Sequence, residues 1–146
     1  MTSLFLLFLL IILVVLSGFL SGSETAITAT SKARILYKKK KGSKRAGYVL
    51  ELLDKKDNVI STLLLSNNLV NILASSLATA FFYDLFGVEG IFYATLIMTV
   101  VIVIFAEVLP KTYAINRPNR TALLIAPIIY YLNKILFIFV FIINSI

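Results

Sequence analysis

The sequence predicts an all-α polytopic membrane protein with three transmembrane helices and further helices along the cytosolic face. The first observation is composition, because 60% of the 146 residues are hydrophobic and the mean hydropathy is +0.97. A soluble domain of this length could not bury so much apolar surface. The second is charge, because ten of the fourteen Lys and Arg residues lie between Lys32 and Lys56. A basic block beside a span normally stays in the cytosol, so we expect segment 32–57 there, on anionic lipid and not on nucleic acid.

The residue types that are missing restrict the chemistry. The chain has no cysteine and no histidine, so it has no disulfide, no thiolate metal site and no imidazole base. A metal site must then consist of oxygen ligands, which suit Mg²⁺, Ca²⁺ or Mn²⁺. An intramembrane enzyme would need a nucleophile paired with a base, and no histidine or intramembrane aspartate offers one. We therefore expect no enzymatic activity.

The first span is predicted at about residues 4–30, with the N-terminus outside. Its apolar run ends at Ser21-Gly22-Ser23-Glu24, which matches the S-x-x-E capping box that starts a helix. This pattern predicts that the helix is broken or kinked near Ser21-Gly22, inside the membrane. Such breaks free backbone carbonyls and persist where they line an ion site. In the alternative, the helix leaves the membrane at Gly22 and an ordinary capped helix follows.

The second span is predicted at about residues 59–83 and is unusually polar. Asn67, Asn71, Ser75 and Thr79 recur at every fourth residue, which places them on one helix face. The face could be polar glue between helices. Three asparagines within five residues (67, 68 and 71) exceed that need, so at least one is also a candidate ligand.

The third span is predicted at about residues 90–115, after an outward-facing loop without basic residues. Glu107 is its only ionisable residue before Lys111, and a carboxylate within a span is a functional candidate. Pro110 follows closely and should kink the helix beside Glu107. The alternative is a glutamate at the helix end that pairs with Lys111 or reaches the surface.

The last segment, about residues 118–146, is apolar but contains Pro127 and the pair Asn133-Lys134. It could form a fourth span, or a Pro-bent pair of juxtamembrane helices along the inner face.

Depth connects the polar positions of the three spans. Ser21, Asn67 and Glu107 each lie roughly 14–15 Å from the cytosolic end of their span, at 1.5 Å per residue. Together they supply hydroxyl, amide and carboxylate oxygens with one negative charge. This set suits a hard cation, and Mg²⁺ takes about six oxygens near 2.1 Å.

Three motifs now resemble the membrane domain of the CorC/cyclin M (CNNM) family. They are Leu20-Ser21-Gly22-Ser23-Glu24-Thr25-Ala26, Ser66-Asn67-Asn68-Leu69-Val70-Asn71 and Phe105-Ala106-Glu107-Val108-Leu109-Pro110-Lys111. They occur in the family's order, and the resemblance covers essentially the whole chain. It implies a homodimeric magnesium transporter of the plasma membrane, chiefly for efflux and coupled to Na⁺. The closest alternatives are another transported cation, Na⁺ or Ca²⁺, or a non-transporting scaffold.

The resemblance also implies a ligand set and missing parts. By resemblance, Mg²⁺ is held by Ser21, Asn67, Asn71 and Glu107, with weaker candidates at Gly22, Ser23, Ser66 and Asn68. We expect Gly22 and Pro110 to act as hinges for alternating access. Full-length members continue into cytosolic CBS domains, which are absent from this chain. Domains attached after residue 146 must be cytosolic, which favours the juxtamembrane helices over a fourth span.

Overall fold

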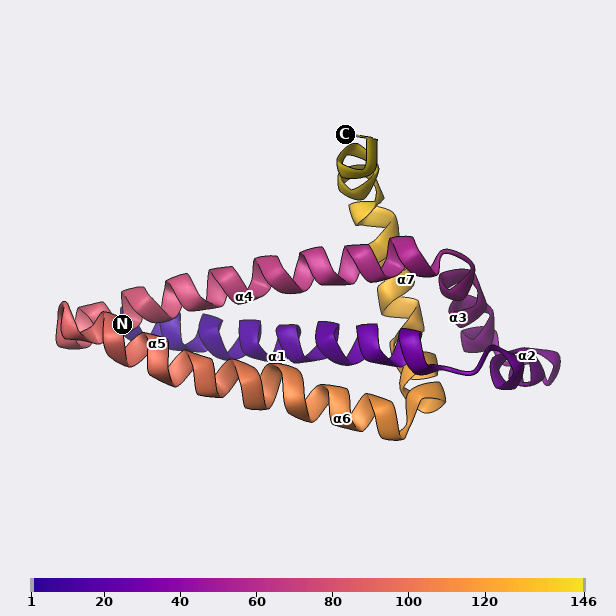
Figure 1. Cartoon of the computed structure of the whole chain (residues 1–146), viewed down its shortest axis with the longest axis horizontal. Helices are drawn as coiled ribbons and strands as arrows, with labels where there is room; N and C mark the ends of the chain where they lie inside the picture. Colours follow the sequence, from indigo (N-terminus) through magenta and orange to yellow (C-terminus); the bar gives the residue numbers. More distant parts are fainter. Residues whose placement is uncertain (1, 146) are drawn as a thin grey trace. The chain divides into compact units, whose positions relative to one another are not determined.

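The computed structural model describes residues 2–145, and over this range the chain is helical without strands (Figure 1). The elements are α1 (Thr2–Ala29), α2 (Lys32–Lys40), α3 (Lys44–Asp54), α4 (Lys56–Phe86), α5 (Glu89–Val101), the π-helix η1 (Ile102–Val108), α6 (Leu109–Asn116) and α7 (Pro118–Ser145). Among the described residues, three stretches are long and apolar enough to cross a membrane, namely Ser3–Ala29, Lys56–Phe86 and Glu89–Asn116. The predicted all-α membrane fold with three long helices is confirmed.

The helices divide into two compact units. The first unit contains α1 up to Ser21 together with Ser66–Pro110. Its core consists of Leu10 from α1, small residues of α4 and α5, and Met98. Alanines at 74, 78 and 94 let the helix backbones approach closely. Gly90 has the same role at the start of α5, because a Cβ atom there would lie only 2.1 Å from the carbonyl oxygen of Phe82.

The second unit contains Gly22–Leu65 and the chain from Lys111 onward. Its buried residues include Ile27, Ile35, Val49, Leu52 and Ile129. Helices α3 and α7 pack together, and the ring centroids of Tyr48 and Tyr130 lie 5.0 Å apart with the planes tilted by 56°. Within this unit, α7 runs across the ends of α1 and α4 that belong to the same unit (Figure 1).

Side-chain caps set the short helices of the second unit. Ser31 accepts a hydrogen bond from the Arg34 N–H at the start of α2, and Ser43 accepts one from the Ala46 N–H at the start of α3. Both serines have extended backbone angles, as an N-cap requires. Asn119 Oδ1 then accepts from the Thr30 hydroxyl at 2.7 Å and from the Ser31 N–H at 2.8 Å. These bonds fix the connection between α1 and α2 to the first turn of α7.

The predicted break near Ser21-Gly22 is wrong, because α1 is one α-helix from Thr2 to Ala29. A capping box needs an extended residue at the N-cap, whereas Ser21 has helical neighbours on both sides. The alternative of a helix that ends at Gly22 fails for the same reason.

The predicted bent pair of helices after residue 118 is also wrong, because α7 continues through Pro127 as a single helix. Pro127 has no N–H for the carbonyl of Leu123, four residues earlier. The Arg45 guanidinium donates to the Leu123 carbonyl at 3.4 Å and to the Leu124 carbonyl at 3.1 Å. The freed carbonyl is therefore satisfied from α3, and the helix need not end there.

Candidate cation site

Two pairs of polar side chains face each other in the first unit. Ser17 and Ser21 are four residues apart on α1, and Asn67 and Asn71 have the same spacing on α4, so each pair shares one helix face. The serine residues are buried, with exposed fractions of 1% and 0%. The asparagines are half-buried. Matching spacings let the two pairs meet across the helix contact.

Asn67 joins the two serines through both ends of its amide. Its Nδ2 donates to Ser21 Oγ at 3.1 Å, and its Oδ1 accepts from Ser17 Oγ at 2.6 Å. Ser21 and Asn67, which were predicted to lie at a common depth, are thus in direct contact. Ser17 Oγ also lies 2.5 Å from Asn71 Oδ1. The four residues thus form one connected cluster, the serine–asparagine cluster.

The cluster holds more oxygens than protons at its centre. Ser17 Oγ lies within 2.6 Å of two amide oxygens, but a hydroxyl has one proton and can donate to only one of them. Both amide oxygens lie within hydrogen-bond distance, so they share the one hydroxyl proton of Ser17. A cation that accepts lone pairs from all three oxygens would resolve this crowding, and neutral oxygen ligands suit a hard cation such as Mg²⁺.

Glu107 lies in η1 and is half-buried. Among the residues that the structure describes, no Lys or Arg forms an ion pair with its carboxylate. Nor does any described hydrogen bond join it to Ser17, Ser21 or Asn67. The structure therefore brings three of the four main predicted ligands together and leaves the Glu107 carboxylate without a direct bond to them.

A π-helical turn carries Glu107. The Leu109 N–H donates to the Ile104 carbonyl, five residues back, as in a π-helix. In this register the carbonyl of Phe105 would pair with residue 110, but that residue is proline and has no N–H. Pro110 is thus accompanied by a widened, π-helical turn, in which the Phe105 carbonyl has no backbone donor within the helix.

That carbonyl lies against α1 beside the cluster. A Cβ atom on Gly18 would be 3.1 Å from the Phe105 oxygen and 3.2 Å from Pro110 Cγ. Gly18 follows Ser17 directly, so the absence of a Cβ atom lets the π-helical turn approach α1 closely at this level. The segment that carries Glu107 is held next to the serine–asparagine cluster in this way.

The weaker candidates are placed differently. Asn68 is exposed, and Ser66 is half-buried with an interaction of its own. Gly22 and Ser23 are buried and belong to the second unit. None of these four takes part in the hydrogen bonds of the cluster that the structure describes.

Ser17 is the site residue that the sequence interpretation missed. Its signal was the spacing Ser17-x-x-x-Ser21, which repeats the spacing of Asn67 and Asn71. Either pair alone is common in a membrane helix. Only the contact between the two pairs identifies them as a candidate site.

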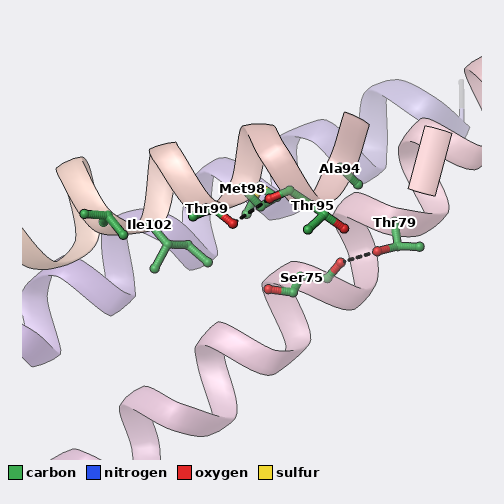
Figure 2. Close-up of a pocket in the computed structure, with 8 residues that line it drawn as sticks. Ser75, Thr79, Ala94, Thr95, Met98, Thr99 and Ile102 are labelled. Atoms are coloured by element: carbon green, nitrogen blue, oxygen red, sulfur yellow. Dashed lines mark hydrogen bonds between the residues drawn. The ribbon is translucent and has the colours of Figure 1, made fainter. Parts of the chain in front are cut away.

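A hydroxyl-lined hollow extends the polar face of α4. One hollow of about 340 Å³ is bordered by Asn71, Ser75 and Thr79. Another of about 350 Å³ shares Ser75 and Thr79 and adds Thr95 and Thr99 of α5 (Figure 2). The Thr79 hydroxyl donates to the Ser75 carbonyl at 2.9 Å, and that of Thr99 to the Thr95 carbonyl at 2.6 Å. Their oxygen lone pairs remain available to water or an ion.

Residues 8–146 match the family model described as the cyclin M transmembrane N-terminal domain. This match covers nearly the whole chain. The chain belongs to the cyclin M (CNNM) family. The domain of this family is a membrane transporter-type domain, and the family is generally associated with transport of Mg²⁺ and other divalent cations.

Relatives of this cyclin M domain occur in bacteria and plants. The UPF0053 inner membrane protein YfjD of Escherichia coli is 40% identical over 131 residues, which cover 82% of this chain and 31% of the relative. A UPF0053 protein of Haemophilus influenzae is 38% identical over 136 residues, covering 93% and 32%. A chloroplastic DUF21 domain-containing protein of Arabidopsis thaliana, At1g55930, is 31% identical over 131 residues, covering 88% and 20%. The chain thus spans about a third or less of the length of these relatives. Its three long apolar helices and its similarity to an inner membrane protein make it a multi-pass membrane protein.

Proposed function

We propose that this domain binds Mg²⁺ and carries it across the plasma membrane, as efflux coupled to Na⁺. The observation that carries the proposal is the convergence of Ser17 Oγ with the amide oxygens of Asn67 and Asn71, which share a single proton. Family membership supports a divalent cation as the substrate.

The ligand set would consist of Ser17, Ser21, Asn67, Asn71 and Glu107. All five offer oxygen, which matches the preference of Mg²⁺. Four ligands are neutral and one is a carboxylate, so a bound Mg²⁺ would keep an excess positive charge. This excess makes release feasible and gives a competing Na⁺ a place to bind.

The route and the mechanism follow from the helices around the cluster. A dehydrated ion held by several protein oxygens is bound too strongly for a channel, so we propose alternating access. Gly22 and Pro110 are the proposed hinges. The hollow lined by Ser75 and Thr79 follows α4 from Asn71 in the direction of the turn at residues 87–88, and we propose it as the outer half of the path.

The proposed topology places the N-terminus outside and segment 32–57 in the cytosol against anionic lipid. Helix α7 would lie along the inner face, which its crosswise course within the second unit supports. We propose that the domain works as a homodimer and that full-length chains add cytosolic CBS domains. None of these roles involves nucleic acid.

Two rivals remain, a carrier of Na⁺ or Ca²⁺ and a scaffold that transports nothing. Ca²⁺ takes six to eight oxygens at longer distances and is favoured by several carboxylates, whereas the proposed ligand set includes one, that of Glu107. A scaffold that transports nothing needs neither a serine in contact with two amide oxygens, as Ser17 is, nor a carboxylate within a span.

Protection of the purified protein by ions tests the proposal. We expect Mg²⁺ to raise the thermal unfolding temperature of the wild type more than Ca²⁺ or Na⁺ does. Glu107→Ala should remove this protection, and Glu89→Ala, at the exposed start of α5, should retain it. Equal protection of wild type and Glu107→Ala would refute the assignment of Glu107.

Labelling of single cysteines tests the topology. We expect an impermeant thiol reagent added outside to label a cysteine at position 86 and not one at position 40. The reverse pattern would invert the model and place the basic segment outside.

A further inference from the structure

An apolar groove in the first unit has no role in the proposed ion path. Its volume is about 320 Å³, and it is bordered by α1 between Leu7 and Val15, by Phe81 and Phe82 of α4, by α5 and by Phe105 of η1. Every side chain that lines it is Leu, Ile, Val, Phe or Met. All of these residues belong to the first unit. We call this feature the apolar groove.

The packing of the unit keeps the apolar groove open. Gly90 brings the start of α5 against the end of α4, and Gly18 brings α1 against η1. The groove lies between these two close contacts, because its α1 part precedes Gly18 and its α5 part follows Gly90. Leu10 and Met98 are its buried residues, with exposed fractions of 6% and 8%, and form its base. The groove is therefore a product of helix packing and not of one side-chain rotamer.

What fills the apolar groove must be hydrocarbon. No lining side chain carries a nitrogen or oxygen atom, so water or an ion would find no partner there. An apolar cavity of about 150 Å³ stays dry and can hold benzene, and this groove has about twice that volume. If the groove stayed empty, its walls would lose dispersion contacts. An apolar ligand restores them.

A helix of a second copy would fit the apolar groove poorly. Membrane helices approach each other closely where Gly, Ala, Ser or Thr lies at the contact, and none of these residue types lines the groove. The branched and aromatic side chains form an irregular wall. A flexible hydrocarbon chain can follow such a wall, whereas a rigid helix cannot.

The position of the apolar groove identifies the source of that chain. Its lining residues lie in the apolar stretches long enough to span a membrane. Ile11, Val15 and Phe105 are 56%, 66% and 57% exposed, so the groove is continuous with the lipid-facing surface of the helices. Leu7 and Val15 are eight residues apart, about 12 Å along α1 at 1.5 Å per residue. The hydrocarbon layer of one leaflet is about 15 Å thick, half of the bilayer core, so the groove fits within one leaflet.

We propose that the apolar groove binds one acyl chain of a bilayer phospholipid, from the leaflet on the side of the N-terminus. The chain packs between α1 and the aromatic rings of Phe81 and Phe105. Phe105 belongs to the π-helical turn that carries Glu107, and its carbonyl lies against Gly18. The bound chain therefore supports this turn from the lipid side. This lipid site does not depend on which ion the domain carries.

Tryptophan fluorescence tests the proposal, because the chain contains no tryptophan of its own. Phe81→Trp places a reporter in the groove, and Phe92→Trp places one at a position that is 64% exposed and does not line it. Each purified variant is reconstituted in phosphatidylcholine with increasing fractions of the same lipid with brominated acyl chains, which quench tryptophan on contact. We expect the fluorescence of Phe81→Trp to fall in proportion to the brominated fraction, as for a single chain. That of Phe92→Trp should fall more steeply, because an open surface touches several chains.

A blocking variant with a matched control completes the test. Val14→Phe, made in the Phe81→Trp background, adds a ring inside the groove and should cause loss of the quenching. Ile12→Phe adds the same ring to α1 outside the groove and should leave the quenching unchanged. If Val14→Phe does not fold, Val15→Phe, at the exposed rim, should still reduce the quenching.

Three results would overturn the proposal. The first is equally steep quenching of Phe81→Trp and Phe92→Trp, which would make the groove an ordinary part of the lipid-facing surface. The second is the absence of quenching in Phe81→Trp, which would show that protein covers the groove, as a second copy could. The third is an unchanged quenching curve when the groove is blocked by Val14→Phe or Val15→Phe.

Discussion

Ser17→Ala separates an ion ligand from a purely structural hydroxyl. In the ion-free protein the hydroxyl can donate to only one of the two oxygens at 2.6 and 2.5 Å. The variant loses one hydroxyl proton that two acceptors share, worth about 1 kcal/mol as a single hydrogen bond. We therefore expect little change in the unfolding temperature without Mg²⁺.

With Mg²⁺ bound, the same change removes one of the proposed oxygen ligands. Hydrogen bonds to charged groups contribute about 1.5–3 kcal/mol, and by that comparison the affinity for Mg²⁺ should fall about ten- to hundredfold. Isothermal titration calorimetry of the purified chain measures this. Ser61→Ala, at an exposed position of α4, is the matched control and should bind as the wild type does. A Kd for Ser17→Ala within twofold of the wild type, or a large loss of stability without Mg²⁺, would refute the reasoning.

Three further predictions concern packing and can be measured by thermal unfolding in detergent. Gly18→Ala should destabilise by about 1–3 kcal/mol, because the new methyl group would press on the π-helical turn at 3.1–3.2 Å. Gly90→Ala should destabilise the protein more, because its Cβ atom would lie 2.1 Å from a carbonyl oxygen of α4. Gly47→Ala is the control, because its Cβ atom would meet nothing within 4 Å. This substitution should stabilise α3 by about 0.5–1 kcal/mol. Arg45→Met should cost about 1 kcal/mol because it leaves an α7 carbonyl without its donor, and Lys44→Met should change little. Equal changes in stability for Gly90→Ala and Gly47→Ala, or for Arg45→Met and Lys44→Met, would contradict these contacts.

The three long helices were predictable because apolar content and length are properties of the sequence alone. The helical bounds Thr2–Ala29 and Lys56–Phe86 lie within three residues of the predicted spans. In a bilayer the backbone must satisfy its own hydrogen bonds, which leaves a long apolar run few alternatives to a helix.

The continuity of α1 through Ser21 was not predictable from a capping pattern, because the same residue types serve other partners. Ser31 and Ser43 do cap helices, with extended backbones and N–H groups within reach. Ser21 instead accepts a hydrogen bond from Asn67, 46 residues away in sequence. A contact of such sequence separation cannot be read from a four-residue motif.

The π-helical turn and the continuity of α7 through Pro127 depend on tertiary contacts in the same way. Pro110 and Pro127 each remove one helical donor, and the sequence predicted a bend at both. The outcomes differ because the two freed carbonyls have different neighbours. The Phe105 carbonyl, which cannot pair with Pro110, lies against Gly18. The Leu123 carbonyl, which cannot pair with Pro127, accepts a hydrogen bond from Arg45. The partner of a freed carbonyl is decided by neighbouring helices and not by the proline.

The central claim is that the serine–asparagine cluster holds the transported cation. Mn²⁺ prefers oxygen ligands as Mg²⁺ does and scatters X-rays anomalously, so crystals grown with Mn²⁺ can locate the ion directly. We predict an anomalous peak about 2.2 Å from Ser17 Oγ and from the Oδ1 atoms of Asn67 and Asn71, which competing Mg²⁺ removes. Anomalous peaks confined to Glu51, Asp54 or other surface carboxylates, with none at Ser17, would contradict the claim.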